Sequence, residues 1–296
     1  MSAALDTGLW AMLVAPLTEF GFMRRALVGS MALSLGCAPV GVFLLLRRMS
    51  LTGDAMAHAI LPGAAIGYLV AGLSLGAMTV GGIAAGLLVA IGSGLVARST
   101  VLREDASLAA FYLLSLALGV LIVSTRGSNV DLLHVLFGTV LALDDATLAL
   151  LVGTAIVSLM ALAVLYRPLV LECLDPQFLR SVSRLSALTH YGFLVLMVIN
   201  LVAGFHALGT LMAVGIMVLP AATARLWVRS VPALMVLASA LALAACVVGL
   251  LLSYHVDWPT SPTIVLALGA AYLVSLVAGR FGAWRLGRSA RRHLRG

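Results

Sequence analysis

The stretch RRMSLTGDAMAHAILPG, residues 47–63, places Asp54 and His58 four positions apart at the start of an apolar segment. On a helix, residues four apart lie on the same face, with their Cβ atoms roughly 5–6 Å from each other. A carboxylate and an imidazole on one face can share a divalent cation. Because the chain has few other charges, this pair is the first candidate for function.

The composition indicates a polytopic membrane protein. Of the 296 residues, 62% are hydrophobic and only 10% are charged, whereas an average soluble domain has roughly 25% charged residues. Apolar runs recur along the whole chain, so we expect residues 1–296 to form a single transmembrane domain. The net charge of +7 does not indicate nucleic-acid binding, because the arginines lie between and after the apolar runs.

The apolar runs predict an all-α fold. A transmembrane helix needs about 20 mostly apolar residues, and the sequence favours about nine such helices, within a range of eight to ten. A weaker stretch at 9–20 is expected to be an interfacial helix. The expected spans are 26–46, 55–72, 76–97, 107–124, 145–166, 188–207, 208–226, 232–252 and 262–279.

The arginines predict the orientation, because cytoplasmic loops carry the excess of positive charge. If the C-terminus is cytoplasmic, only Arg24, Arg25 and Arg126 lie outside. The opposite orientation would place nearly all arginines outside. We therefore expect the N-terminus outside and the C-terminus inside.

Two segments between spans stand out. Residues 125–144 contain an apolar stretch that is too short to span and that carries Asp131 and His134. A short re-entrant or interfacial helix near 130–141 fits it, since such backbone is tolerated only against protein or a water-filled cavity. Residues 167–187 form the longest expected cytoplasmic loop, where a cytoplasmic partner could bind.

Glycines spaced by four residues indicate closely packed helices. Gly63 and Gly67 form one such pair, and Gly82 and Gly86 form another. Small residues at this spacing let transmembrane helices approach each other closely. Tight packing of the bundle is a sufficient explanation for these glycines.

Two interpretations of Asp54 and His58 are equally supported by their spacing. An aspartate within a membrane helix costs at least ~2.5 kcal/mol on insertion scales and marks a functional site by default. Pro62, one turn later, removes a backbone hydrogen bond and could kink or unwind the helix. Alternatively, Asp54 caps the helix N-terminus and His58 bonds a neighbouring helix. As ligands, carboxylate and imidazole suit zinc, manganese and iron(II). A set of thiolate ligands would have indicated copper, and the sequence has no such set.

Other candidates lie toward the expected outer side. His206 and His255 could collect a metal ion at the entrance, although an interfacial role is the simpler explanation for each. Asp131 and His134 could add to an outer vestibule, or could cap and pack a short helix.

Four stretches together resemble a known family. They are residues 48–63, residues 133–142 (LHVLFGTVLA), residues 208–225 (LGTLMAVGIMVLPAATAR) and residues 250–257 (LLLSYHVD) with the prolines that follow. They occur in the order found in the permease subunits of bacterial ABC importers for zinc, manganese and iron(II). The resemblance covers roughly residues 24–280.

The resemblance implies a function and a set of partners. It implies a multi-pass permease of the bacterial cytoplasmic membrane that forms a homodimer, with one ATPase docked on each cytoplasmic face and a metal-binding protein outside. The partners would thus be protein chains and membrane lipid, without nucleic acid. The sequence has no G-x-x-x-x-G-K-[ST] pattern, which agrees with ATP hydrolysis by another chain.

The resemblance also implies roles for individual residues. Asp54 and His58 correspond to metal ligands in the translocation path, whereas the predicted topology puts Asp54 near the cytoplasmic end of its span. Either this helix begins deeper than hydropathy suggests, or the site is close to the inner exit. A coupling helix near 175–183 would sit in the ATPase groove. This chain departs from the family pattern at two positions of that helix: it has Leu179 in place of a small residue and Ser183 in place of glycine. The expected coupling residues are Asp175, Pro176, Gln177, Phe178, Leu179 and Arg180.

Zinc is the metal that we expect first, because His206 and His255 add imidazoles near the outer side. Zinc would be the transported substrate, and no permanently bound cofactor is expected. Manganese or iron(II) is the first alternative. A permease for a siderophore or cobalamin, and then a membrane metalloenzyme, are weaker alternatives, since no His-Glu-x-x-His pattern or clear third ligand accompanies the pair.

Overall fold

The computed structural model describes residues 19–72, 74–101, 104–126, 143–175, 178–179 and 185–281. Within these ranges the chain forms nine helices, and eight of them are long and apolar enough to cross a membrane. The predicted all-α polytopic fold is therefore confirmed. The helices are α3 (Gly21–Leu46), α4 (Thr52–Ala71), α5 (Leu75–Ser99), α6 (Glu104–Arg126), α8 (Asp145–Leu174), α10 (Leu185–Leu208), α11 (Thr210–Arg225), α12 (Val231–Val256) and α13 (Thr260–Ala278).

Each expected span corresponds to one helix, and the lengths of two helices, α8 and α11, change the expected topology. Helix α8 continues through Pro168 to Leu174, because the residues after the proline are apolar and Leu169 and Glu172 are buried. The loop expected at 167–187 is therefore shorter than predicted. Helix α11 has 16 residues and is about 24 Å long, less than the ~30 Å apolar core of a bilayer. Most of the expected interfacial helix at 9–20 and all of that at 130–141 lie outside the described residues.

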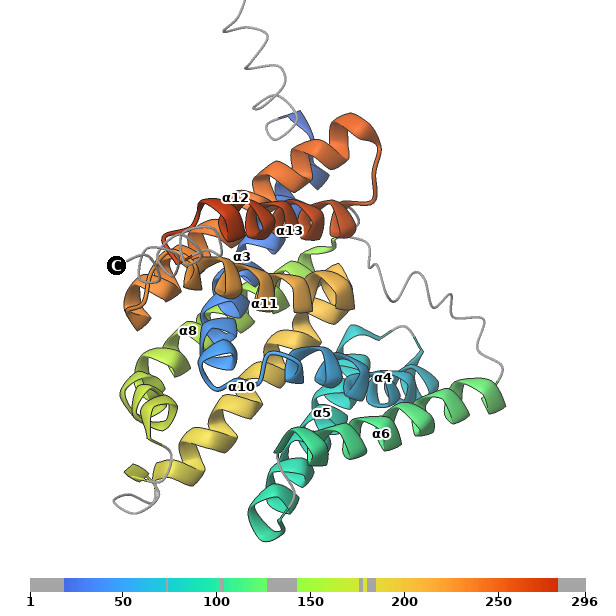
Figure 1. Cartoon of the computed structure of the whole chain (residues 1–296). Helices are drawn as coiled ribbons and strands as arrows, with labels where there is room; N and C mark the ends of the chain where they lie inside the picture. The colour runs from blue at the N-terminus through green and yellow to red at the C-terminus, as the bar shows by residue number, and fades with distance from the viewer. Residues whose placement is uncertain are drawn as a thin grey trace, which may run out of the picture.

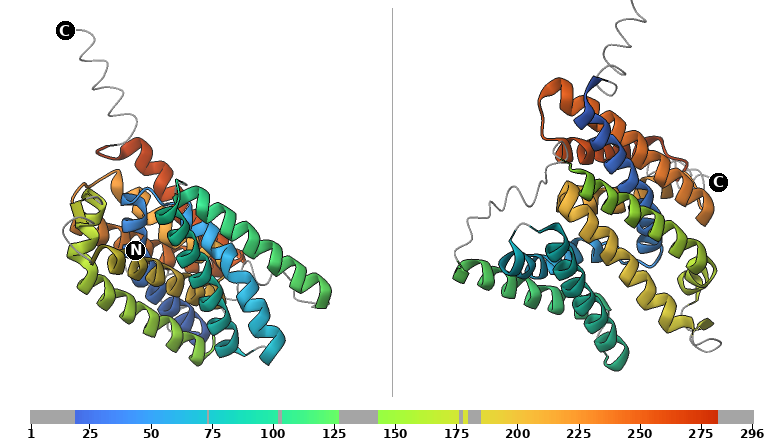
Figure 2. Two further views of the ribbon diagram at one scale, coloured as in Figure 1. Left: turned by 90° about the horizontal axis from the view of Figure 1, so that it is seen from below. Right: turned by 180° about the vertical axis from the view of Figure 1, so that it is seen from behind.

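The helices form two groups (Figure 1). Helices α4, α5 and α6 pack on one another, and the other six helices form a larger group. Helix α10 joins the two groups by contacting both α5 and α4, and α11 adds a contact to α4. The views from below and behind show the same division (Figure 2).

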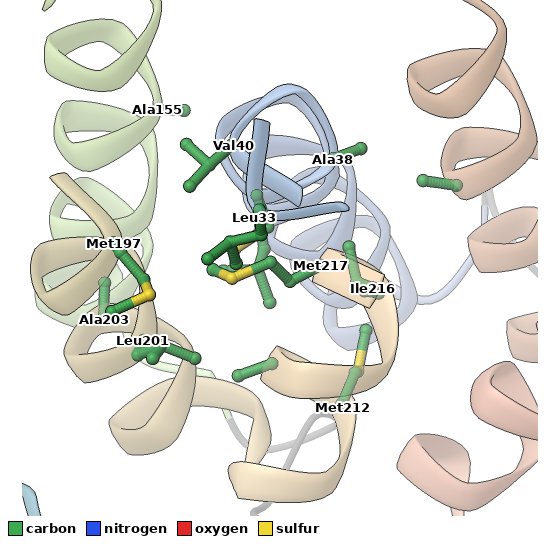
Figure 3. Close-up of a cluster of buried hydrophobic side chains, with 14 of the residues drawn as sticks. Leu33, Ala38, Val40, Ala155, Met197, Leu201, Ala203, Met212, Ile216 and Met217 are labelled. Carbon is green, nitrogen blue, oxygen red and sulfur yellow. The ribbon is translucent and has the colours of Figure 1, made fainter. Parts of the chain in front are cut away.

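Helix α3 lies at the centre of the larger group and is the most completely buried of the candidate spans in the described chain. It contacts α8, α10, α11 and α12. Leu33 and Val40 of α3 lie in one buried cluster with Met197 and Leu201 of α10 and Met217 of α11 (Figure 3). At Gly41 a side chain would collide with the carbonyl of Met217, so the backbones of α3 and α11 are in direct contact.

Hydrogen bonds between polar side chains supplement this packing. Asn200 of α10 donates to the Ser158 hydroxyl of α8 at 2.6 Å and to the Leu196 carbonyl at 2.8 Å. Ser34 of α3 lies 3.1 Å from the sulfur of Cys246 on α12. Interhelical bonds of this kind contribute about 0.6 kcal/mol on average in membrane proteins, so they align the helices more than they stabilise them.

The glycine spacing has the predicted effect between α4 and α5. A side chain at Gly63 would collide with the Gly81 carbonyl, and one at Gly67 would collide with the Ala77 carbonyl. On α5, Gly86 leaves room for the Val198 side chain of α10. The helices of the smaller group can therefore pack only with glycine at these positions.

Contacts at the helix ends agree with the predicted alternation of the spans. The Arg25 Nε atom lies 3.2 Å from Asp145 Oδ1, which brings the starts of α3 and α8 together. Asp144 accepts a hydrogen bond from Thr147 N at 2.9 Å and caps α8; hydrogen bonds from Thr147 lower the pKa of this carboxyl. Because Asp145 neutralises Arg25, one of the arginines predicted to lie outside carries a local counter-charge.

We expect Gly63→Ala to destabilise the protein, because the new methyl group would force α4 away from the backbone of α5. Overpacking of this kind costs about 1–3 kcal/mol. The midpoint of thermal unfolding in detergent, followed by tryptophan fluorescence, should fall. Gly153→Ala in α8 is the matched control, since no atom lies within 4 Å of the added carbon; equal midpoints for the two variants would contradict the prediction.

Candidate metal site

Asp54 lies in the first turn of α4 but does not cap it. The N-cap position is Leu51, and no side-chain cap hydrogen bond is present. The interpretation of Asp54 as an N-cap is therefore wrong. Its negative charge is still favoured there, because the N-terminus of a helix carries a partial positive charge.

Asp54 and His58 form a pair on one face of α4, as their spacing predicts. The Asp54 Oδ1 atom lies 4.0 Å from His58 Nε2, and the side chains are 67% and 36% exposed. This separation is too long for a strong hydrogen bond, but it leaves both groups free to ligate one ion. No group of three metal-ligating side chains occurs among the described residues, so the pair needs further ligands from elsewhere.

The pair lies on the side of α4 that the described residues leave open. The opposite side, with Met56 and Ile60, is fully buried and packs on neighbouring helices. Along the open side, Leu51 is exposed near the start of the helix and Ile66 near its end. A second molecule could therefore approach the carboxylate and the imidazole without any rearrangement of α4.

Pro62 does not unwind α4, which is helical from Thr52 to Ala71. Proline cannot donate to the carbonyl one turn earlier, which is that of His58. The hydroxyl of Ser115 on α6 donates to the adjacent carbonyl of Ala59 at 2.9 Å. This bond joins α6 to α4 beside the carbonyl that the proline leaves free.

The packing of Gly53 shows how deep α4 begins. A side chain at Gly53 would meet the Met217 sulfur at 3.8 Å and Val218 at 4.0 Å. Both residues are in the middle of α11. The first turn of α4 therefore lies beside the centre of that helix rather than its end, and this favours a helix that begins deeper than hydropathy suggests.

The two other predicted ligands that the structure describes, His206 and His255, do not form a group with the pair. His206, half-buried in the last turn of α10, directs its Nδ1 to the Val202 carbonyl at 2.9 Å, and its Nε2 has no hydrogen-bond partner among the described residues. His255 is exposed in the last turn of α12. Asp131 and His134 lie outside the described residues.

The predicted coupling helix is described only in part. Asp175 ends α8 and accepts a hydrogen bond from Phe178 N at 2.9 Å, which starts a new turn. Phe178 is exposed, whereas Leu179 is buried. The expected departure at Leu179 thus lies on the side that packs against the rest of the chain. Pro176, Gln177 and Arg180 lie outside the described residues.

Sequence reasoning missed a buried charged cluster formed by Arg47, Glu172 and His190, here called the Arg47 cluster. Arg47 Nη2 lies 2.6 Å from Glu172 Oε1, and the two side chains are only 7% and 5% exposed. The Arg47 guanidinium also lies 3.2 Å from His190 Nδ1. The available signal was Glu172, a glutamate among otherwise apolar residues at 169–174.

Comparison with known proteins decides the family. The model of the ABC 3 transport family matches residues 19–279. The chain belongs to the ABC 3 transport family. Membership makes it a multi-pass bacterial membrane protein and the permease subunit of an ABC transporter, rather than an enzyme.

Relatives of this ABC 3 family member include proteins with named substrates. It is 32% identical to the manganese import system permease protein ScaB of Streptococcus parasanguinis, over 88% of this chain and 91% of the relative. It is 28% identical to the chelated iron transport system membrane protein YfeD of Yersinia pestis, over 87% and 86%. Its fold matches PsaBC from Streptococcus pneumoniae in complex with Fab, with a TM-score of 0.80 at 29% identity over 92% and 96%.

We expect Ser115→Ala to destabilise the ABC 3 permease slightly, because the hydrogen bond from α6 to the Ala59 carbonyl of α4 would be lost. An interhelical bond of this kind contributes about 0.6 kcal/mol on average, and scanning calorimetry in detergent measures the loss. Ser99→Ala is the control, since that exposed hydroxyl bonds only carbonyls of its own helix. A Ser115→Ala protein as stable as the Ser99→Ala protein would refute the role of this bond.

Proposed function

We propose that this chain is the permease of an ATP-driven importer for a divalent transition metal, with manganese or iron(II) as substrate. One observation carries the proposal. In a member of the ABC 3 transport family, a carboxylate and an imidazole lie 4.0 Å apart on the open face of α4. In this proposal Asp54 and His58 hold the ion during its passage.

Manganese and iron(II) replace zinc as the first choice. Relatives are named for manganese and iron. The preference for zinc rested on His206 and His255, but no described group of three ligands includes them. A carboxylate with an imidazole suits manganese and iron(II) at least as well as zinc.

A second copy of the chain would complete the site. Two ligands alone bind an ion weakly, and the pair faces outward on α4. If the open faces of two copies met around a symmetry axis, each would contribute Asp54 and His58, giving four ligands. Closed two-fold symmetry is the commonest arrangement of identical chains, and it would also bury the exposed carboxylates.

Transport in this proposal follows from alternating access. The single domain would be driven by two partner ATPases, which would act on the segment after Asp175 with its exposed Phe178. A metal-binding protein outside would deliver the ion. A site with few ligands is suited to this task, because an ion must leave as readily as it enters.

We expect Asp54→Ala and His58→Ala each to reduce manganese uptake to background, because the remaining ligands would no longer hold the ion. Uptake of radioactive manganese is measured in liposomes that contain the permease, its ATPase and its binding protein, with iron(II) and zinc as competitors. Co-purification of the ATPase shows that the variants still assemble.

Asp145→Ala is the control for these variants. Asp145 is also an acidic residue in the first turn of its helix, and its side chain is 80% exposed, but it lies in α8. Uptake by this variant should equal that of the wild type. Normal manganese and iron(II) uptake by Asp54→Ala or His58→Ala would exclude the proposed site.

The two-copy site predicts one manganese ion per pair of permease chains. Equilibrium dialysis of the purified complex, followed by elemental analysis, gives this ratio, and Asp54→Ala should abolish the binding. One ion per chain, or binding that persists in the variant, would contradict a shared site.

A further inference from the structure

The Arg47 cluster joins three helices inside the bundle. Arg47 is the C-cap residue of α3, Glu172 lies in the last turn of α8, and His190 lies in the second turn of α10. The Glu172 carboxylate contacts both other members, at 2.6 Å from Arg47 Nη2 and 3.7 Å from His190 Nδ1. The guanidinium also stacks over the Phe193 ring, 4.9 Å from its centroid.

A buried ion pair is poor evidence of stabilisation. Removing two charges from water costs several kcal/mol per ion, and apolar side chains of similar size are often as stable or more so. The neighbouring residues are apolar and aromatic: Phe43 packs edge-to-face on Phe193 at 6.5 Å and on Tyr166 at 6.3 Å. Apolar side chains would therefore fit the same place. The ion pair of Arg47 with Glu172 is thus better explained by a role other than stability.

The cluster lies between the end of α8 and the connection from α3 to α4. Glu172 precedes Asp175, where the turn of Phe178 begins. Arg47 starts the connection from α3 to α4, which is held tightly: Arg48 N bonds the Leu45 carbonyl at 3.1 Å, Met49 N bonds the Leu44 carbonyl at 2.9 Å, and Thr52 N bonds the Met49 carbonyl at 3.0 Å. A displacement of Glu172 would therefore move this rigid connection and, with it, the first turn of α4.

We propose that the Arg47 cluster is the positioning element that transmits movement of the cytoplasmic end of α8 to the ligands on α4. This inference rests on the proposed function. The ion pair and the hydrogen bond keep α8, α10 and the start of α4 in one geometry, so that ATPase movement and opening of the ion path occur together. Arg47, Glu172 and His190 touch no ion themselves.

The test uses the reconstituted transporter and measures metal ions imported per ATP hydrolysed. The double variant Arg47→Met/Glu172→Met removes both charges, so neither is left buried alone, and it should assemble with a thermal midpoint near that of the wild type. We expect ATP hydrolysis to persist while the ratio of imported metal to ATP falls about tenfold, within the range typical of coupling between sites. His190→Gln, which removes no buried charge pair, should lower the same ratio less.

The control is Arg25→Met/Asp145→Met, which removes the exposed ion pair at the opposite ends of α3 and α8 and should keep the wild-type ratio. A wild-type ratio in the assembled Arg47→Met/Glu172→Met and His190→Gln variants would overturn the inference and leave the proposed function intact. Failure of both variants to assemble would also overturn it, since the cluster would then be structural. A wild-type complex that imports no metal would overturn the proposed function and the inference with it.

Discussion

Direct contact between helix backbones is the constraint on which this architecture depends. At Gly63 and Gly81 the backbones of α4 and α5 touch, and at Gly41 the backbone of α3 touches that of α11. In a membrane, apolar side chains gain little by leaving lipid for protein, so close approach and van der Waals contact must hold the helices together. The glycines thus fix where α4 lies, and α4 carries the candidate ligands.

The charged side chains described above differ in burial, and therefore in what they contribute to stability. The exposed Arg25–Asp145 pair is at one end of the bundle, and the buried Arg47 cluster is toward the other. Exposed pairs contribute about 0–1 kcal/mol, whereas a buried pair is costly to break. Asp54 and His58 belong to neither class, because they face outward from α4 without a partner chain that covers them.

Much of the fold could be predicted from the sequence, because membrane helices must be long, apolar and internally hydrogen-bonded. All nine expected spans have a helix, and the glycine spacing predicted close packing, which α4 and α5 show. Helix α8 continues beyond the expected end at 166, through Pro168 to Leu174, and the short α11 was expected to be a full span. The Asp54–His58 pair followed from spacing. The Arg47 cluster did not, because it joins residues far apart in the chain.

The open face of α4 has a consequence for how the protein is made. A single copy in the bilayer would present a carboxylate on a helix face that the described residues leave uncovered, and an aspartate that faces lipid is costly. If a second copy covers that face, as proposed, the cost is removed on assembly. The residues proposed to hold the cargo would then also favour the assembled transporter over the single subunit.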